Sequence, residues 1–546
     1  MQEIKANIVS IAKQEIKFGT VYFEGGIIQK IILESPEKQD FGYLIPGFVD
    51  AHVHIESSML SPVQFARLAV VHGTVGTVSD PHEIGNVLGV KGVEWMIENA
   101  QQTPLKICLG APSCVPATTF ETAGATIEPA DIKYLFEKYP SVGYLAEVMN
   151  FPGVLNKDPD MMAKINIAKI LNKPIDGHAP GLVGDLAKQY IEAGPSTDHE
   201  CFTAFEALEK LKYGMKIIIR EGSAAKNFDA LIPLAHEHYQ KMMFCSDDKH
   251  PDNLVEGHIN KLVARAVTQG LDKFKALSMA CVNPVEHYHL PIGLLAENHP
   301  ADFVLVDNLQ NFEVLATYIN GKLVAEKGAS LLPNVLSEAI NYFEISAKKL
   351  EDFEFEVSEN QTLKVIECID GQLITNKINH KILKDTHNFE SDLTNDILKI
   401  VVVNRYKPSK IAISFIKNIG LKRGAIASSV AHDSHNIVAV GTNDKDLCKA
   451  VNLIIEAQGG ISAVDTEKYQ LLALPIAGLM ANADGYEVAK AYTQIDQFAK
   501  QNLGSTLNSP FMSLSFMALL VIPHLKLSDL GLFDGTNFEL TSSVEG

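Results

Sequence analysis

The sequence lacks several features that would place the protein in a familiar class. Its seven cysteines are scattered and form no Cys-x-x-Cys pair, so neither a disulfide framework nor a structural zinc finger is expected. It has no run of about 18 uncharged apolar residues, and residues 1–20 hold no uninterrupted apolar stretch, so we expect no membrane span and no secretory signal. The formal net charge of -19 disfavours nucleic-acid and anionic-membrane partners, since both favour basic surfaces. A cytoplasmic location is the simplest expectation.

The pattern of apolar residues predicts a (β/α)8 barrel in the first part of the chain. From residue 46 to residue 300, strand-like apolar runs alternate with longer segments of helical periodicity. The strand candidates begin near Phe48, Thr74, Lys106, Val142, Pro174, Gly194, Met215 and Met242. Eight strands with intervening helices over roughly 250 residues are typical of a TIM-like barrel. No Gly-x-Gly-x-x-Gly follows the first strand, which disfavours a doubly wound sheet.

The segments outside the barrel predict two further domains, as a chain of 546 residues allows. Residues 1–45 and 301–345 contain short strands with turns, and we expect them to pair in one small β-sandwich beside the barrel. Residues 331–353 have the pattern of a helical linker. Residues 346–546 mix strands and helices and form an additional C-terminal α/β domain. The predicted fold class is therefore α/β, a TIM-like barrel with a flanking small β-sandwich and an additional C-terminal α/β domain.

The stretch at residues 46–56 carries the first chemical signal. It reads as an apolar strand that ends in His52-Val53-His54. Residues i and i+2 of a strand point to the same side, so the two imidazoles could bind one metal ion. Such a pair can also be two ordinary structural histidines. Its position at the C-terminal end of the first barrel strand favours function, because active sites of these barrels lie at that end.

Imidazoles and carboxylates also follow other strand candidates at the same end. The candidate metal ligands are His52, His54, Glu147, His178, His199 and Asp247. Any one of these residues alone is more often structural, so the argument depends on their shared position. Imidazole and carboxylate are the ligands expected for a divalent-metal hydrolytic site, and two neighbouring ions need a bridging carboxylate, which Glu147 can supply. Strand alternation turns Asp248 to the opposite side from Asp247, unless the strand has already ended there.

These motifs resemble the amidohydrolase superfamily and, within it, the adenine deaminase family. The resemblance covers nearly the whole chain. The motif of the first strand is common to the superfamily, whereas those after the second strand and in the C-terminal part are more specific. The resembling stretches are residues 46–58, 80–87, 176–181, 245–248, 429–436 and 474–480.

The resemblance implies hydrolytic deamination of adenine to hypoxanthine and ammonia at a binuclear centre of manganese or iron, with zinc as an alternative. One ion would be held by His52, His54 and Asp247, the other by His178 and His199, with Glu147 between them. Metal-activated hydroxide would attack C6 of the purine. Asp247 would carry the proton from the water toward the leaving amine. His82 and Glu83 are further candidates for groups that transfer protons. A homo-oligomer, most simply a dimer, is expected.

Other functions fit parts of this pattern. An N-acetyl-sugar deacetylase can also use a glutamate after the fourth strand, whereas a dihydroorotase-like enzyme uses a carbamylated lysine there. A non-catalytic purine-binding scaffold on an inactivated barrel should have lost ligands, and none of the six is missing. The role of residues 432–436 stays open between a polar turn and a contribution to the pocket.

Overall fold

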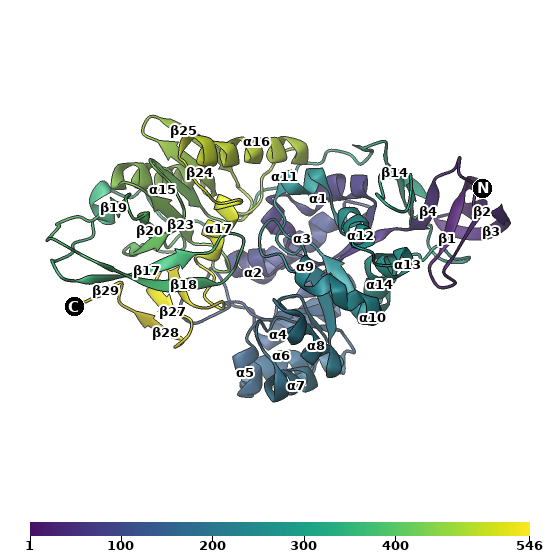
Figure 1. Ribbon diagram of the computed structural model, residues 1–546, viewed down its shortest axis with the longest axis horizontal. Helices are drawn as coiled ribbons and strands as arrows, with labels where there is room; N and C mark the ends of the chain where they lie inside the picture. The colour runs from purple at the N-terminus through teal and green to yellow at the C-terminus, as the bar shows by residue number, and fades with distance from the viewer.

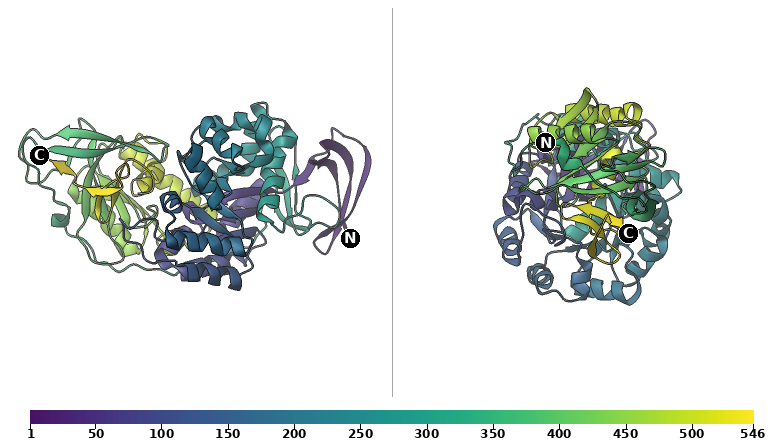
Figure 2. Two further views of the ribbon diagram at one scale, coloured as in Figure 1. Left: turned by 90° about the horizontal axis from the view of Figure 1, so that it is seen from below. Right: turned by 90° about the vertical axis from the view of Figure 1, so that its left-hand side faces the viewer.

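The computed structural model describes residues 1–546 as an elongated molecule with the barrel in its middle (Figure 1). The sheet that holds the N-terminus lies at one end and the C-terminal part lies at the other, as the left view of Figure 2 shows. No helix of the structure is both long enough and apolar enough to cross a membrane.

The barrel consists of eight parallel strands in sequential order, as predicted. The strands are β5 (Phe48–Val53), β6 (Thr74–Ser79), β7 (Lys106–Ala111), β8 (Val142–Val148), β9 (Ile175–Gly177), β10 (Thr197–Asp198), β11 (Lys216–Arg220) and β12 (Met242–Cys245). A parallel bridge between Val53 and Asp247 brings β12 beside β5 and closes the barrel. Strands β5 and β6 are buried along their whole length, because helices cover the outside and side chains fill the inside.

Helices surround the barrel and connect its strands. They are α1 (Pro62–Ala69), α2 (His82–Leu88), α3 (Val90–Ala100), α4 (Pro129–Lys138), α5 (Phe151–Leu155), α6 (Pro159–Ile170), α7 (Gly184–Ala193), α8 (Ala204–Lys212), α9 (Phe228–Leu231), α10 (Ala235–His238), α11 (Pro251–Glu256), α12 (Ile259–Thr268), α13 (Lys273–Leu277) and α14 (Asn283–Tyr288). The local sequence determines where several of these helices begin. For α6, the Asp158 side chain accepts a hydrogen bond from the amide of Met161, and Pro159 occupies the first turn.

Strands from before and after the barrel share one eight-stranded sheet. They are β1 (Gln2–Ser10), β2 (Glu15–Glu24), β3 (Ile27–Pro36), β4 (Tyr43–Pro46), β13 (Phe303–Val306), β14 (Val314–Ile319), β15 (Lys322–Glu326) and β16 (Ala329–Ser330). Strand β13 pairs with β4, which joins the two segments, and residues of both segments share one hydrophobic cluster. This pairing supports the flanking domain that we propose from residues 1–45 and 301–345.

The predicted helical linker is wrong. Residues 331–349 contain neither helix nor strand, and only a short 3-10 helix follows at Leu350–Phe353. The segment is held by tertiary contacts instead of by its own helical hydrogen bonds. Ile340 and Tyr342 pack against the main core, and the Tyr342 carbonyl accepts a hydrogen bond from the Arg405 guanidinium at 3.0 Å.

The C-terminal part is rich in sheet and carries three α-helices, α15 (Asp444–Ala457), α16 (Gly485–Gln497) and α17 (Pro510–Phe516). Neighbours in its large sheet run antiparallel, except that β17 and β21 are parallel. The strands are β17 (Thr362–Cys368), β18 (Thr375–Lys381), β19 (Ser391–Asp392), β20 (Ile397–Val403), β21 (Ala412–Lys417), β22 (Ala425–Ser428), β23 (Ile437–Gly441), β24 (Gly460–Asp465), β25 (Lys468–Ala473) and β29 (Val544–Glu545), with β26 (Leu525–Ser528), β27 (Gly531–Asp534) and β28 (Glu539–Thr541) in a separate sheet.

Candidate metal centre and active site

The two histidines at the end of the first barrel strand lie close to a carboxylate that follows the last barrel strand. The Nε2 atoms of His52 and His54 lie 3.2 Å apart. The Asp247 Oδ1 atom lies 3.4 Å from the Nε2 atom of His52 and 3.3 Å from that of His54. Ligand atoms about 2.1 Å from one tetrahedral ion are separated by roughly 3.4 Å. The spacing and chemistry of these three groups therefore fit a divalent metal ion.

Backbone hydrogen bonds at the barrel seam hold this group together. The Asp247 amide donates to the His52 carbonyl at 2.9 Å, and the His54 amide donates to the Asp247 carbonyl at 3.2 Å. Asp50 lies two residues before His52 on the same strand, and its buried carboxylate accepts hydrogen bonds from the Ser246 amide at 3.0 Å and from the Ser246 hydroxyl. The positions of the candidate ligands are thus set by main-chain pairing between the first and last strands.

Glu147 lies between this group and a second one. Its Oε2 atom is 2.7 Å from the Nδ1 atom of His178 and 3.2 Å from the Nε2 atom of His199. Its Oε1 atom faces the other group, 3.3 Å from the Nε2 atom of His54. The two oxygens of one carboxylate therefore point to two sets of imidazoles. The structure brings all six predicted ligands together at the C-terminal ends of the barrel strands.

The charges of the centre favour ionised carboxylates. Burial alone would raise the pKa of Glu147, but His178 and His199 hold this pKa well below its usual range. Burial would also raise the pKa of Asp247, and Arg220 and the neighbouring imidazoles hold it well below its usual range. Metal ions bind the deprotonated forms of their ligands, so both carboxylates are in the state that binding requires.

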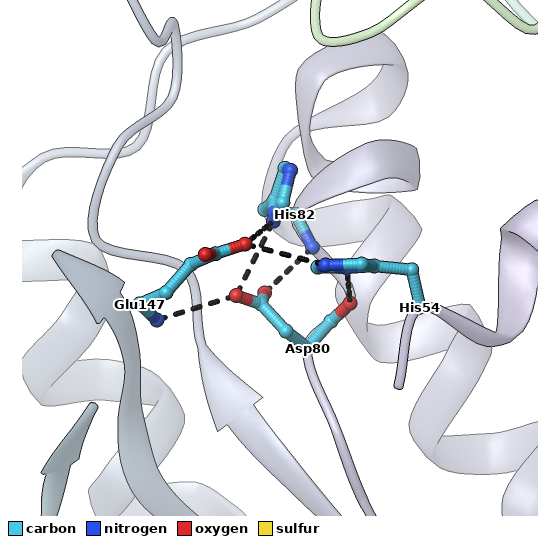
Figure 3. Close-up of side chains that lie close together, drawn as sticks. All are labelled: His54, Asp80, His82 and Glu147. Atoms are coloured by element: carbon cyan, nitrogen blue, oxygen red, sulfur yellow. Dashed lines mark hydrogen bonds and ion pairs between the residues drawn. The ribbon is translucent and has the colours of Figure 1, made fainter. Parts of the chain in front are cut away.

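His82 lies beside the centre, close to His54, Asp80 and Glu147 (Figure 3). It begins α2, and its amide donates to Asp80 at 3.0 Å. The Nδ1 atom of His82 is 3.2 Å from Asp80 Oδ2 and 3.5 Å from Glu147 Oε1. Neither ring nitrogen of this buried side chain has a hydrogen-bond partner. Burial would lower the pKa of His82, but the carboxylates of Asp80 and Glu83 hold it well above its usual range, so the ring can donate a proton.

Glu83 points instead to the C-terminal part of the chain. Its Oε1 atom lies 3.0 Å from the Nε2 atom of His432, and its Oε2 atom pairs with the His435 ring. Burial would raise the pKa of Glu83, but His432, His435 and His82 hold it well below its usual range. A carboxylate in this state can accept a proton or a hydrogen bond. Residues 432–436, whose role the sequence alone does not decide, thus contact a predicted catalytic residue directly.

The C-terminal part closes the barrel mouth. A small cavity of about 30 Å³ lies over the centre, between the barrel and the C-terminal part. The lining residues are His54, His82, Glu83, Glu147, Met149, His178, His199, Glu200, Arg220, Asp247, Asp248, Leu373, His432, Asp433 and Leu519.

Asp248 lies at the site, as expected where the strand has already ended. Strand β12 ends at Cys245, so the alternation no longer applies two residues later, and both Asp247 and Asp248 line the cavity. The Asp248 carboxylate accepts a hydrogen bond from the Ser57 hydroxyl at 2.6 Å and lies 3.2 Å from the Nε2 atom of His432.

Sequence reasoning missed three charged residues at the centre. Glu200 lies 3.5 Å from His199 Nε2 and forms an ion pair with Arg220, whose Nη1 atom lies 3.0 Å from Asp247 Oδ2. Asp80 accepts a hydrogen bond from the Glu147 amide at 3.3 Å. A signal was present, because Arg220 ends β11 while Asp80 and Glu200 follow β6 and β10 within two residues.

Comparison with known proteins shows which family has this combination of domains. Residues 43–324 match the model of the amidohydrolase family, and residues 372–539 match that of the adenine deaminase C-terminal domain. The chain is 54% identical over 541 residues to an adenine deaminase from Sulfurovum sp. (strain NBC37-1), covering 99% of both chains. It is 51% identical over 537 residues to an adenine deaminase from Salinibacter ruber, covering 98% of both. The chain therefore belongs to the adenine deaminase family of the amidohydrolases.

Proposed function

We propose that the protein hydrolyses adenine to hypoxanthine and ammonia. The observation that carries this function is the identity of 54% and 51%, over almost the whole chain, to proteins named adenine deaminase. The C-terminal match favours this activity over that of an N-acetyl-sugar deacetylase, which shares only the barrel arrangement. The buried carboxylates and imidazoles described above favour an enzyme over a purine-binding scaffold.

The protein uses a divalent metal, and we propose a pair of manganese or iron ions. His52, His54 and Asp247 would hold one ion, while His178 and His199 would hold the other, with Glu147 between them. A divalent ion bound there would lower the pKa of a water molecule and make hydroxide available near neutral pH.

The remaining chemistry is proton transfer by side chains of the barrel. Arg220 binds the Oδ2 atom of Asp247, so Oδ1, the oxygen nearest His52 and His54, would both hold the ion and accept the proton. Hydrolysis forms a bond from oxygen to C6 and breaks the bond from C6 to the amine, which must receive a proton before it leaves as ammonia. Asp247 would deliver that proton. His82 and the ionised Glu83 line the same cavity and would share in these proton transfers.

A turnover assay tests the function directly. Protein loaded with Mn(II) or Fe(II) is given adenine, adenosine or cytosine, and ammonia release is measured beside a chelator-treated sample. We expect turnover of adenine alone and its loss after chelation. Comparable turnover of adenosine would refute the free-base preference, and no turnover of adenine with both ions bound would refute the proposed function.

We further propose a cytoplasmic homo-oligomer, most simply a dimer. The acidic net charge and the scattered cysteines support the location. Light scattering of the purified protein tests the assembly, and a mass of one chain would contradict it.

A further inference from the structure

The outer wall of the cavity belongs to the C-terminal part of the chain. Leu373 and Leu519 supply apolar surface, and His432 and Asp433 supply polar groups. All other lining residues come from the barrel. A ligand held over the metal centre is therefore enclosed between two parts of the chain, and its far side must meet these four residues.

Asp433 is the polar group of this wall that lacks a full set of partners. The residue is only 2% exposed, and its Oδ2 atom has no hydrogen-bond partner. The Oδ1 atom lies 3.6 Å from the Nε2 atom of His82, beyond hydrogen-bond distance. A buried carboxylate oxygen without a donor is costly, so a ligand that brings an N–H group to it would be bound strongly.

The surroundings hold Asp433 in place. Its neighbour His432 lies between Glu83 and Asp248, and the Ser515 hydroxyl lies 2.6 Å from the other ring nitrogen of His432. The hydroxyl of Tyr406 donates to the carbonyl of Ser434 at 2.5 Å. Because the segment is fixed on both sides, the position of the carboxylate is set before a ligand arrives.

We propose that Asp433 selects the free base by accepting a hydrogen bond from the N–H group of the imidazole half of adenine. The inference rests on the proposed adenine deamination. Free adenine has this N–H group, whereas a purine substituted at N9 has none. A site built to bind a substrate N–H group rejects the analogue that lacks it by as much as about 10⁴–10⁵. The enclosing wall adds to the selection, because a ribose at N9 would have to displace it.

The test measures binding separately from turnover. Calorimetry on the metal-loaded wild type, Asp433→Asn and Asp433→Ser compares hypoxanthine, the proposed product, with 9-methylhypoxanthine. We expect the wild type to favour hypoxanthine by roughly 10² or more, and both variants to lose most of this preference with unchanged metal content. Adenine turnover of each protein is measured in parallel.

Glu121 provides the matched control. It is buried beside Asp433 but does not line the cavity, and burial together with the Asp433 charge raises its pKa to about 8. It is therefore protonated at neutral pH, and Glu121→Gln should keep the full preference. If folded Asp433 variants keep the wild-type preference, or the wild type itself has none, the inference is wrong. Absence of adenine turnover in the loaded wild type would instead refute the proposed function.

Discussion

The amide of Asp247 donates a hydrogen bond to the carbonyl of His52 at 2.9 Å, and this bond lies at the seam where the barrel closes. Two candidate ligands of one ion are therefore fixed by the same pairing of the first and last strands. Their relative position depends on barrel closure, so changes to either side chain act on a preformed group.

Asp247→Asn should abolish most turnover while it weakens metal binding less. The amide keeps the shape and can still coordinate through oxygen, but it cannot accept the proton of the attacking water. General acid–base assistance is worth roughly 10²–10⁴-fold. Asp248→Asn is the comparison, and it should keep the full metal content and lose less activity. Metal analysis and ammonia release of both variants provide the measurement; normal activity of Asp247→Asn would contradict the assignment.

Glu147→Gln should lower the metal content below two ions per chain. A neutral amide bridges two cations poorly, and the two oxygens of Glu147 face different imidazole groups at 2.7 Å and 3.3 Å. Elemental analysis after dialysis measures the stoichiometry. Glu94→Gln, on the barrel exterior where Glu94 pairs with Lys138, is the control and should keep both ions. Equal metal content in the two variants would remove Glu147 from the proposed bridge.

Lys210→Met should destabilise the protein by about 3–5 kcal/mol, because it leaves buried acceptors without their cation. The Lys210 ammonium is buried and binds Asp198 at 2.8 Å, Glu206 at 2.7 Å and the Ala179 carbonyl at 2.7 Å. Denaturant unfolding measures the loss. Lys212→Met on the exposed side of the same helix should change stability by less than about 0.5 kcal/mol. Similar losses in both variants would argue against a role for the buried pair.

His250 should make the fold sensitive to acid. Burial lowers its pKa to about 3, whereas a histidine of the unfolded chain titrates near pH 6.5. Between these values the unfolded state binds more protons, so the contribution of this group to stability is complete above about pH 6.5 and is lost as the pH falls toward 3, by up to about 1.4 kcal/mol per pH unit. His250→Phe should lose less stability between pH 6.5 and 5 in thermal melts; a slope equal to that of the wild type would contradict this.

Local patterns in the sequence were enough to find the barrel and most of its centre. Most of the barrel strands are short apolar runs, and five of the eight predicted starts, those at Phe48, Thr74, Lys106, Val142 and Met242, coincide with the observed ones. A strand repeats every two residues, so His52 and His54 had to face the same side. The ends of parallel barrel strands meet at one mouth, which brought the remaining ligand candidates together.

Only the tertiary structure decided how the mouth is closed. Glu83 and His435 are paired although 352 positions separate them, and no local periodicity records such a contact. The position of Asp248 could not be read from alternation, because the strand ends before it. The sequence by itself determined which side chains stand at the strand ends. Which of them face the metal centre, and which face the C-terminal domain, depends on the packing of that domain against the barrel.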